Sequence, residues 1–273
     1  MRAFVFDVDN TLTPPRRPLE PEMAAALIEL PVAFHVAAGS DVALVREQLV
    51  DPLWAAGFRG TFDAFVCNGS DRYRFEIDDD IRPQVLRTFS LRKHLGKVGF
   101  QTLMDTLTRR LADPAFAIDA QAVAVIGGRI IDRGSMINLA PIGRPIKMTP
   151  AAYTNRDAFV AFDQRTGFRR RLLEQLHQDL APLIRDRGLW ITLGGQTSFD
   201  IVIAGNDKTF PLRTLADEGY DDLTYFGDAL HEHGNDAAVL EFVREQEHQK
   251  MVRVRAVQVT DWRDTLQHLQ RYL

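Results

Sequence analysis

Short apolar runs alternate with amphipathic segments along the first part of the chain. Residues 4–6, 32–37 and 62–66 are apolar runs of strand length. Residues 21–30 and the segment that begins at Gly39-Ser40-Asp41 have the apolar spacing of helices, and serine or aspartate is available as an N-terminal cap. Strands that alternate with helices favour a parallel sheet covered by helices.

The pattern changes between residues 73 and 205. Strand-like runs are interrupted there by glycine and proline and are interleaved with long amphipathic stretches. Residues 122–126 and 189–193 each precede a glycine pair, which predicts strands that enter hairpin turns at Gly127-Gly128 and Gly194-Gly195. This part of the chain therefore predicts an antiparallel sheet that carries helices.

The parallel pattern returns after Lys208 and continues to the end of the sequence. The expected elements are a helix at 211–218, a strand at 223–226, a helix from 235, a strand at 252–259 and a helix from 262. We therefore expect an α/β protein with a doubly wound, Rossmann-like core domain formed by residues 1–82 and 206–273. Residues 83–205 are expected to form an inserted α+β domain.

Composition narrows the class of protein without identifying it. The formal net charge is -4, which gives no electrostatic reason to expect nucleic acid as a partner. Cys67 is the single cysteine, so no internal disulfide is expected. No apolar run approaches the roughly 18 residues of a membrane span. The expectation is a cytoplasmic protein with no membrane partner.

Polar residues follow several of the predicted strands. In open parallel sheets, ligands bind beyond the carboxyl ends of the strands. Asp7 and Asp9 follow the first strand, Ser40 follows the second, and Lys208 stands where the parallel pattern resumes. Asp228 follows a later strand, with Asn235-Asp236 shortly after it. These residues are the candidates for a catalytic site, although acids at strand ends are also common as turn and cap residues.

The chemistry of these side chains suits phosphoryl transfer. Carboxylates from two strands form an all-oxygen site of the kind that Mg²⁺ prefers. The candidate metal ligands are Asp7, Asp9, Asp228, Asn235 and Asp236. One aspartate can act as a covalent nucleophile, and a second carboxylate can protonate the leaving oxygen. Lys208 and Ser40 can bind phosphoryl oxygens. These groups provide the positioning and charge neutralisation on which phosphoryl transfer depends.

Arginines distinguish the inserted segment. Arg133, Arg144 and Arg156 could each hold a phosphate through two parallel hydrogen bonds, and Asp200, with Ser198 on the same face of a strand, would suit sugar hydroxyls. Taken singly, each arginine is also typical of a solvated surface.

The order of the motifs resembles the haloacid dehalogenase superfamily of phosphotransferases. An apolar strand leads into Asp7-Val8-Asp9 and Thr11-Leu12-Thr13, and Gly39-Ser40-Asp41, Lys208 and Gly227-Asp228 follow in that order. Within the superfamily, the chain closely resembles the eukaryotic-type phosphomannomutases. The segments that carry this resemblance also include Pro15-Arg16, Asn68-Gly69, residues 136–144, Gly194-Gly195-Gln196, Ser198-Phe199-Asp200 and Gly234-Asn235-Asp236. Asn10 stands where that family usually has glycine.

The resemblance implies a role for each matched residue. Asp7 would be the nucleophile, Asp9 the general acid and base, and Mg²⁺ would be held by Asp7, the Asp9 backbone carbonyl and Asp228. The implied sugar-phosphate contacts are Arg16, Arg133, Arg144, Arg156, Ser198 and Asp200. The inserted domain would be a second-class cap that closes over the site and forms a homodimer. A hexose 1,6-bisphosphate would supply the phosphoryl group.

Three functions follow from these residues. The first is a hexose phosphomutase acting on a hexose phosphate, with phosphomannomutase favoured. The second is a magnesium-dependent sugar-phosphate phosphatase, which would need one phosphate site where a mutase needs two. A non-catalytic sugar-phosphate-binding protein is disfavoured, because every acid that the chemistry needs is present.

Overall fold

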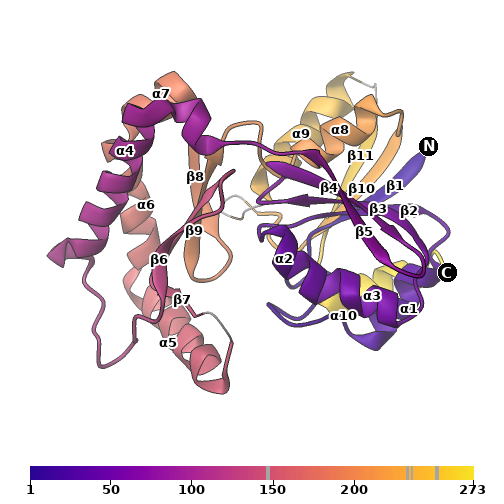
Figure 1. Ribbon diagram of the computed structural model, residues 1–273, viewed down its shortest axis with the longest axis horizontal. Coiled ribbons are helices and arrows are strands. Elements are labelled where there is room, and N and C mark those ends of the chain that lie inside the picture. The colour runs from indigo at the N-terminus through magenta and orange to yellow at the C-terminus, as the bar shows by residue number, and fades with distance from the viewer. Residues whose placement is uncertain (146–147, 232–233, 235, 250–251) are drawn as a thin grey trace. The chain divides into compact units, whose positions relative to one another are not determined.

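The structure is a computed structural model that describes residues 1–145, 148–231, 234, 236–249 and 252–273 (Figure 1). The chain forms two compact units. The first unit combines residues 1–88 with residues 205–273, and the second consists of residues 89–204. A doubly wound α/β unit is thus interrupted by an inserted one, which agrees with the expected fold class.

The first unit is built on a mixed sheet whose central strands are parallel. Among the described residues the sheet has seven strands in the order β11-β10-β1-β2-β3-β4-β5. Their bounds are β1 (Arg2–Phe6), β2 (Ala33–Ala37), β3 (Gly60–Val66), β4 (Asp71–Ile77), β5 (Ile81–Arg87), β10 (Asp222–Gly227) and β11 (Arg253–Gln258). The five strands other than β4 and β5 run parallel. Their carboxyl ends therefore meet at one edge of the sheet, where Asp7 follows β1 and Asp228 follows β10.

Helices cover both faces of this sheet. Figure 1 shows α8 (Phe210–Asp217) and α9 (Ala237–Gln249) on one face. The other face carries α1 (Pro21–Glu29), α2 (Val42–Val45), α3 (Asp51–Ala55) and α10 (Trp262–Leu269). Because both faces are covered, the central strand β1 is apolar at nearly every position and its residues 3–6 are fully buried. The apolar runs of the sequence therefore became the centre of the sheet, as predicted.

The β4–β5 hairpin extends the sheet beyond what the sequence pattern predicted. Both strands pair antiparallel to their neighbours. The expected domain boundary after residue 82 falls inside β5, whose residues up to Arg87 pair with β4. Residues 83–88 consequently belong to the first unit. The ladder hydrogen bonds continue through residues 83–87. The sequence pattern changes before the strand ends, so it does not predict where this strand ends.

The inserted unit packs helices on one face of an antiparallel sheet. The described strands follow the order β6-β7-β9-β8, with bounds β6 (Gly128–Asp132), β7 (Ile137–Arg144), β8 (Leu189–Gly194) and β9 (Ser198–Ile203). The helices are α4 (Leu91–Ala112), α5 (Pro150–Thr166), α6 (Phe168–Asp179) and α7 (Ala181–Arg187). Ile137, Leu139, Phe199 and Ile201 join the hydrophobic core beneath the helices. Side chains alternate along a strand, so Asn138, Ser198 and Asp200 are presented on the opposite face.

One predicted strand of the inserted unit is wrong. Residues 122–126 precede β6 and are not a strand. Backbone N–H groups of Ala122 and Val123 donate to the Asp119 carbonyl, and the Asn155 side chain bonds both the N–H and the C=O of Ala124. These bonds occupy backbone groups of residues 122–124 that a ladder would use, and the Ile126 N–H donates to the Ile142 carbonyl of β7. The hairpin turn lies after β6, where Arg133 N–H donates to the Met136 carbonyl, whereas the turn at Gly194-Gly195 is confirmed.

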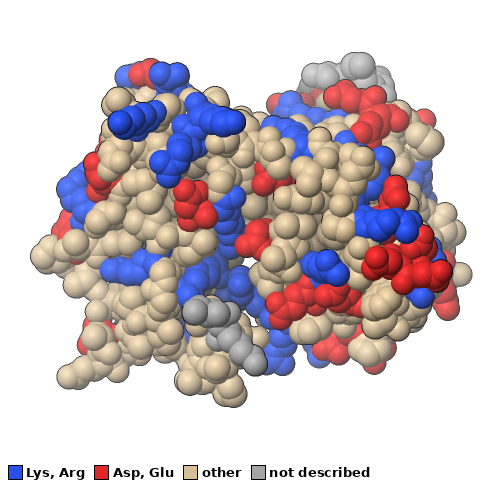
Figure 2. Space-filling view, in the orientation of Figure 1, with Lys and Arg blue, Asp and Glu red and all other residues tan. Residues whose placement is uncertain are grey.

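The surface carries both signs of charge. Figure 2 shows basic and acidic side chains interspersed on the face in view. Arg46 pairs with Asp51 and Arg82 with Asp78, and all four side chains are exposed. Exposed pairs of this kind contribute little to stability. Within the part of the chain that the structure describes, no helix combines the length and apolar character needed to span a membrane.

Candidate active site

A tight loop follows β1 and carries the Asp7-to-Thr13 stretch. The Val8 carbonyl accepts backbone N–H bonds from Leu12 at 2.9 Å and from Thr13 at 3.0 Å, and the Asn10 N–H donates to the Thr13 carbonyl. Leu12 is fully buried beneath the loop. Asn10 has φ +67°, a left-handed conformation that glycine and asparagine adopt most readily. The loop geometry therefore explains why either residue type can stand at this position.

Asp7 is fixed by a buried lysine. Asp7 is 4% exposed, and Lys208 Nζ donates to its Oδ1 at 2.7 Å. The same Nζ lies 2.7 Å from Asp236 Oδ1. A lysine as deeply buried as Lys208, at 1% exposure, is uncommon unless it is paired with carboxylates. The prediction that Lys208 and Asp7 share a site is consistent with this geometry.

Asp236 accepts hydrogen bonds on both of its carboxylate oxygens. In addition to Lys208, the Tyr225 hydroxyl donates to Oδ1 at 2.8 Å, and the Ala229 N–H donates to Oδ2 at 3.3 Å. A Cβ at Gly227 would lie 2.4 Å from Asp236 Oδ2, so this position requires glycine. Because these donors already occupy both oxygens, we interpret Asp236 as the residue that orients Lys208 and the Gly227–Ala229 turn.

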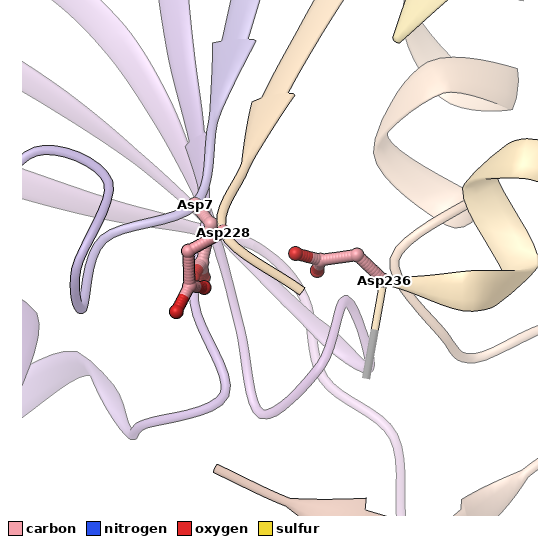
Figure 3. Close-up of side chains that lie close together, drawn as sticks. All are labelled: Asp7, Asp228 and Asp236. Atoms are coloured by element: carbon pink, nitrogen blue, oxygen red, sulfur yellow. The ribbon is translucent and has the colours of Figure 1, made fainter. Parts of the chain in front are cut away.

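Asp228 extends from the end of β10 toward Asp7 (Figure 3). Asn10 Nδ2 donates to Asp228 Oδ2 at 3.0 Å. One carboxylate oxygen from each of Asp7, Asp228 and Asp236 lies within 4.8 Å of the others. Three carboxylates thus face one ammonium group, and the all-oxygen set fits Mg²⁺. Asn235, also predicted as a metal ligand, lies outside the described residues.

Burial and mutual repulsion perturb these groups. Burial raises the pKa of Asp7 well above its usual range, Lys208 opposes the shift, and Asp236 and Asp228 add to it. Burial also raises the pKa of Asp228, against the hydrogen bond from Asn10. For Lys208 burial acts to lower the pKa, but the carboxylates of Asp236 and Asp7 outweigh it and the net pKa is raised. The cluster therefore holds an excess of negative charge that a bound divalent cation would relieve.

Asp9 has different partners from Asp7. Its Oδ1 accepts from the backbone N–H of Arg16 at 2.7 Å and from Gln48 Nε2 at 2.8 Å. Arg16 itself has φ +56°, so the chain turns sharply where it contacts Asp9. Ser40 lies just after β2, whose carboxyl end adjoins that of β1, and its carbonyl accepts the N–H of Cys67. Asp9 and Ser40 are therefore positioned at the predicted edge of the sheet.

The inserted unit brings three of its predicted residues together. Arg144 Nη2 donates to Ser198 Oγ at 3.0 Å, and Arg144 Nε donates to Asn138 Oδ1 at 3.0 Å. Asn138 Nδ2 in turn donates to Asp200 Oδ1 at 2.7 Å. A Cβ at Gly194 would lie 2.6 Å from Asp200 Oδ1, which explains the glycine beside this carboxylate. The network holds a cation, an acid and a hydroxyl on the polar face of the sheet.

The other two arginines that were predicted as site residues of the inserted unit lie near its turns. Arg133 follows β6 and contacts the sulfur of Met136. Arg156 lies on α5 and donates to Gln196 Oε1, in the turn between β8 and β9, at 3.1 Å. Their predicted role as sugar-phosphate contacts stays a prediction.

Three side chains important to these networks were not among the predicted site residues. They are Gln48, Tyr225 and Asn138. Tyr225 stands inside an apolar strand, and Gln48 lies in a helical segment far from either acid in sequence. Asn138 could have been suspected, because it is a polar residue within an apolar run that pairs directly with Asp200. Only the strand register reveals that pairing.

Comparison with known proteins assigns the chain to a family. A model described as "Eukaryotic phosphomannomutase" matches residues 23–271. Phosphomannomutase from Schizosaccharomyces pombe is 34% identical over 85% of this chain and 82% of its own length. The chain belongs to the eukaryotic phosphomannomutase family. Phosphomannomutase 1 from Homo sapiens, another relative, is 30% identical over 85% of this chain and 80% of its own length.

Solved structures agree on the fold. An IMP-bound, N-terminally truncated Plasmodium falciparum IMP-nucleotidase superposes with a TM-score of 0.58 at 12% identity, covering 99% of this chain and 67% of that one. A Thermoplasma acidophilum protein, 0175, gives 0.54 at 15% identity and covers 100% of this chain and 98% of that one. The predicted fold, a Rossmann-like core with an inserted α+β domain, is thus confirmed. The family match covers residues 23–271 and so does not include the Asp7-to-Thr13 loop.

Proposed function

We propose that this protein is a phosphomannomutase that interconverts mannose 6-phosphate and mannose 1-phosphate. Family membership supports the activity. The observation that carries the chemistry is the buried cluster in which Lys208 holds Asp7 beside Asp228. A carboxylate fixed by one ammonium group and crowded by other acids is suited to attack phosphorus once cations screen the negative charges.

The first step loads the enzyme. A carboxylate oxygen of Asp7 attacks one phosphorus of a hexose 1,6-bisphosphate, and the bond from that phosphorus to the sugar oxygen breaks. Asp9 gives its proton to the leaving sugar oxygen. Lys208, which bonds Asp7 Oδ1, holds the nucleophile in one orientation. Asp7 is then an aspartyl-phosphate.

The following steps move the phosphoryl group between positions of the sugar. The C1 hydroxyl of mannose 6-phosphate attacks the aspartyl-phosphate, and Asp9 accepts the hydroxyl proton. Mannose 1,6-bisphosphate then turns and returns its other phosphoryl group to Asp7, which leaves mannose 1-phosphate. Asp9 therefore acts alternately as base and acid.

Magnesium is the proposed cofactor. Asp7 and Asp228 would hold the ion, with Asp236 supporting them through Lys208. When bound, it would neutralise phosphoryl oxygens and reduce repulsion between phosphate and carboxylate. The contribution of the Asp9 carbonyl stays a prediction.

A bisphosphate needs a second set of phosphate-binding residues. Arg144 supplies a guanidinium fixed by Asn138 and Ser198, and Asp200 offers a carboxylate to sugar hydroxyls. We propose that this network binds the phosphate and hydroxyls remote from the phosphorus under attack. A simple phosphatase would not need it.

One assay tests the proposal. The protein is incubated with Mg²⁺, mannose 1-phosphate and a catalytic amount of glucose 1,6-bisphosphate, and both mannose 6-phosphate and free phosphate are followed. Isomerisation that depends on the bisphosphate is the expected result. Phosphate release that exceeds isomerisation would instead favour the phosphatase, and the absence of both products would favour a binding protein.

Two further expectations belong to the proposal. Dimer formation through the inserted unit is checked by the mass of the protein in solution. A cytoplasmic location is checked by fractionation of cells that express the protein.

A further inference from the structure

Gln48 is a buried amide at the centre of the hydrogen bonds around Asp9. It lies on a single π-helical turn, Arg46–Val50, between α2 and α3, and it is 1% exposed. Its Nε2 donates to Asp9 Oδ1 at 2.8 Å, with longer contacts to the Arg17 carbonyl and Thr13 Oγ1. Single π-helical turns inside helices are rare and occur often at functional sites.

The Gln48 backbone also bonds the loop between β1 and α1, which contains Thr13 and Arg17. Its carbonyl accepts the N–H of Leu19 at 2.7 Å. The second donor to Asp9 Oδ1 is the backbone N–H of Arg16, which belongs to that loop. Gln48 thus joins the Asp9 carboxylate and both ends of the segment that carries Arg16.

Burying the Gln48 amide costs folding free energy, and good packing alone does not require an amide here. Gln48 Oε1 is buried, and among the described residues it has no hydrogen-bond partner. A buried polar atom without a partner destabilises the folded state. An apolar side chain of similar length would fill the space without that cost. The property that glutamine adds is an N–H donor aimed at Asp9.

We propose that Gln48 is a positioning residue that orients the Asp9 carboxylate for proton transfer to and from the sugar oxygen. This inference rests on the proposed function, because it deepens the role of Asp9 in that reaction. Gln48 contacts Asp9 rather than the reacting atoms. Its effect should therefore appear only in steps that need the Asp9 proton.

The leaving group separates such steps from the others. A sugar alkoxide is a poor leaving group and needs a proton as its bond to phosphorus breaks, whereas acetate leaves from acetyl phosphate without one. Both reagents can phosphorylate Asp7. Comparing them isolates proton transfer from attack by the nucleophile.

The test uses Gln48→Met, which keeps the length of the side chain and removes the donor. Phosphorylation of Asp7 by glucose 1,6-bisphosphate and by acetyl phosphate is measured from the mass of the intact protein after rapid quenching. We expect a loss of about 10- to 100-fold with the sugar bisphosphate. The rate with acetyl phosphate should change by less than about threefold. Asp9→Asn should show the same selectivity, and Gln101→Met, at an exposed glutamine of α4, should show neither loss.

Equal losses of rate with the two reagents would overturn the inference and leave Gln48 a merely structural residue. Unchanged rates with both reagents would also overturn it. Should Gln48→Met fail to fold, Gln48→Glu is used, which keeps the size but points a carboxylate at Asp9. It should show the same selectivity. If the wild-type protein is phosphorylated by both reagents but does not isomerise mannose phosphates, the proposed function fails, and the two phosphorylation rates still decide the role of Gln48.

Discussion

The two units hold their functional side chains by different physical means. In the first unit, Asp7, Lys208 and Asp236 are charged groups that are almost fully buried and paired with one another. In the inserted unit, Arg144 donates to two neutral groups, the Asn138 amide and the Ser198 hydroxyl, and the Asn138 amide donates to Asp200. Opposed charges at short range thus fix the reacting groups, whereas a chain of hydrogen bonds fixes the proposed binding groups.

One device is common to both units. Gly227 allows Asp236 to approach the end of β10, and Gly194 allows Asp200 to approach the end of β8. In each case a Cβ would lie closer than 3 Å to a carboxylate oxygen. The difference between the units therefore lies in what surrounds the carboxylate. Removing the cation of the buried ion cluster leaves carboxylates without compensation, whereas removing a neutral member of the hydrogen-bond network leaves a polar group without its partner.

The largest expected effect comes from Asp7→Asn. This variant keeps the shape of the nucleophile and removes its charge, so isomerase activity should fall by at least about a thousandfold. Stability without Mg²⁺ should be equal or higher, because crowding with Asp228 and Asp236 is relieved. Activity is measured by the coupled isomerase assay and stability by urea unfolding.

Asp51→Asn is the matched control, since Asp51 is exposed and pairs only at the surface with Arg46. It should retain both properties. Substantial activity in Asp7→Asn would show that Asp7 is not the nucleophile. The proposal that the first unit holds the reacting groups and the inserted unit the binding groups would then fail.

The sequence predicted the first unit better than the second. Asp7 and Asp228 follow apolar strands directly, and strand ends in a parallel sheet meet by topology, so their convergence could be predicted without coordinates. Lys208 could also be placed, because it stands where the parallel pattern resumes. In contrast, the pairing of Asn138 with Asp200 depends on antiparallel register, which no local pattern in the sequence encodes.

Local signals failed where side chains override periodicity. Residues 122–126 are apolar enough for a strand, but the N–H groups of Ala122 and Val123 bond the Asp119 carbonyl, and the Asn155 side chain bonds Ala124. The position of Gln48 depends on a π-helical turn, whose register differs from that of an α-helix, so the sequence does not predict its contact with Asp9. The sequence shows Asn10 in place of the usual glycine, and the backbone angle and the bond to Asp228 give the physical reason.

A second prediction measures how strongly charge holds the first unit. Lys208→Met leaves Asp7 and Asp236 buried without their cation. We expect a loss of about 3–5 kcal/mol in the free energy of unfolding without Mg²⁺, and a smaller loss with saturating Mg²⁺, because the ion would replace part of the charge. Urea unfolding at both metal concentrations checks this.

Lys93→Met removes an exposed lysine at the start of α4 and should cost little under either condition. A small loss for Lys208→Met without metal would contradict the view that buried ion pairing fixes the nucleophile.

A third prediction applies to the inserted unit. Arg144→Ala removes the guanidinium but leaves the Asn138 bond to Asp200 in place. We expect kcat/KM to fall by about 10- to 100-fold, the range of one or two charge-assisted hydrogen bonds to phosphate, and the free energy of unfolding to change by only about 1 kcal/mol.

Arg170→Ala, at an exposed arginine of α6, is the control and should leave kcat/KM unchanged. If Arg144→Ala instead destabilises the protein as much as Lys208→Met does, the contrast between the two units does not hold. An unchanged kcat/KM would reject Arg144 as a phosphate ligand.

The smallest expected effect is that of Asn10→Gly, which removes one hydrogen bond from the ion cluster of the first unit. Glycine adopts φ +67° without strain, so the loop should keep its shape, and only the donor to Asp228 Oδ2 is lost. Removing a hydrogen bond from a metal-binding carboxylate should weaken Mg²⁺ affinity by about tenfold, measured by titration calorimetry on the substrate-free protein.

Asn10→Ala removes the same donor but adds strain of about 1–2 kcal/mol at a left-handed position, so it should lower stability as well. If Asn10→Gly binds Mg²⁺ as tightly as the wild-type protein, charge alone orients Asp228. The first unit would then hold its acids by charge without help from this hydrogen bond, and its contrast with the inserted unit would be sharper.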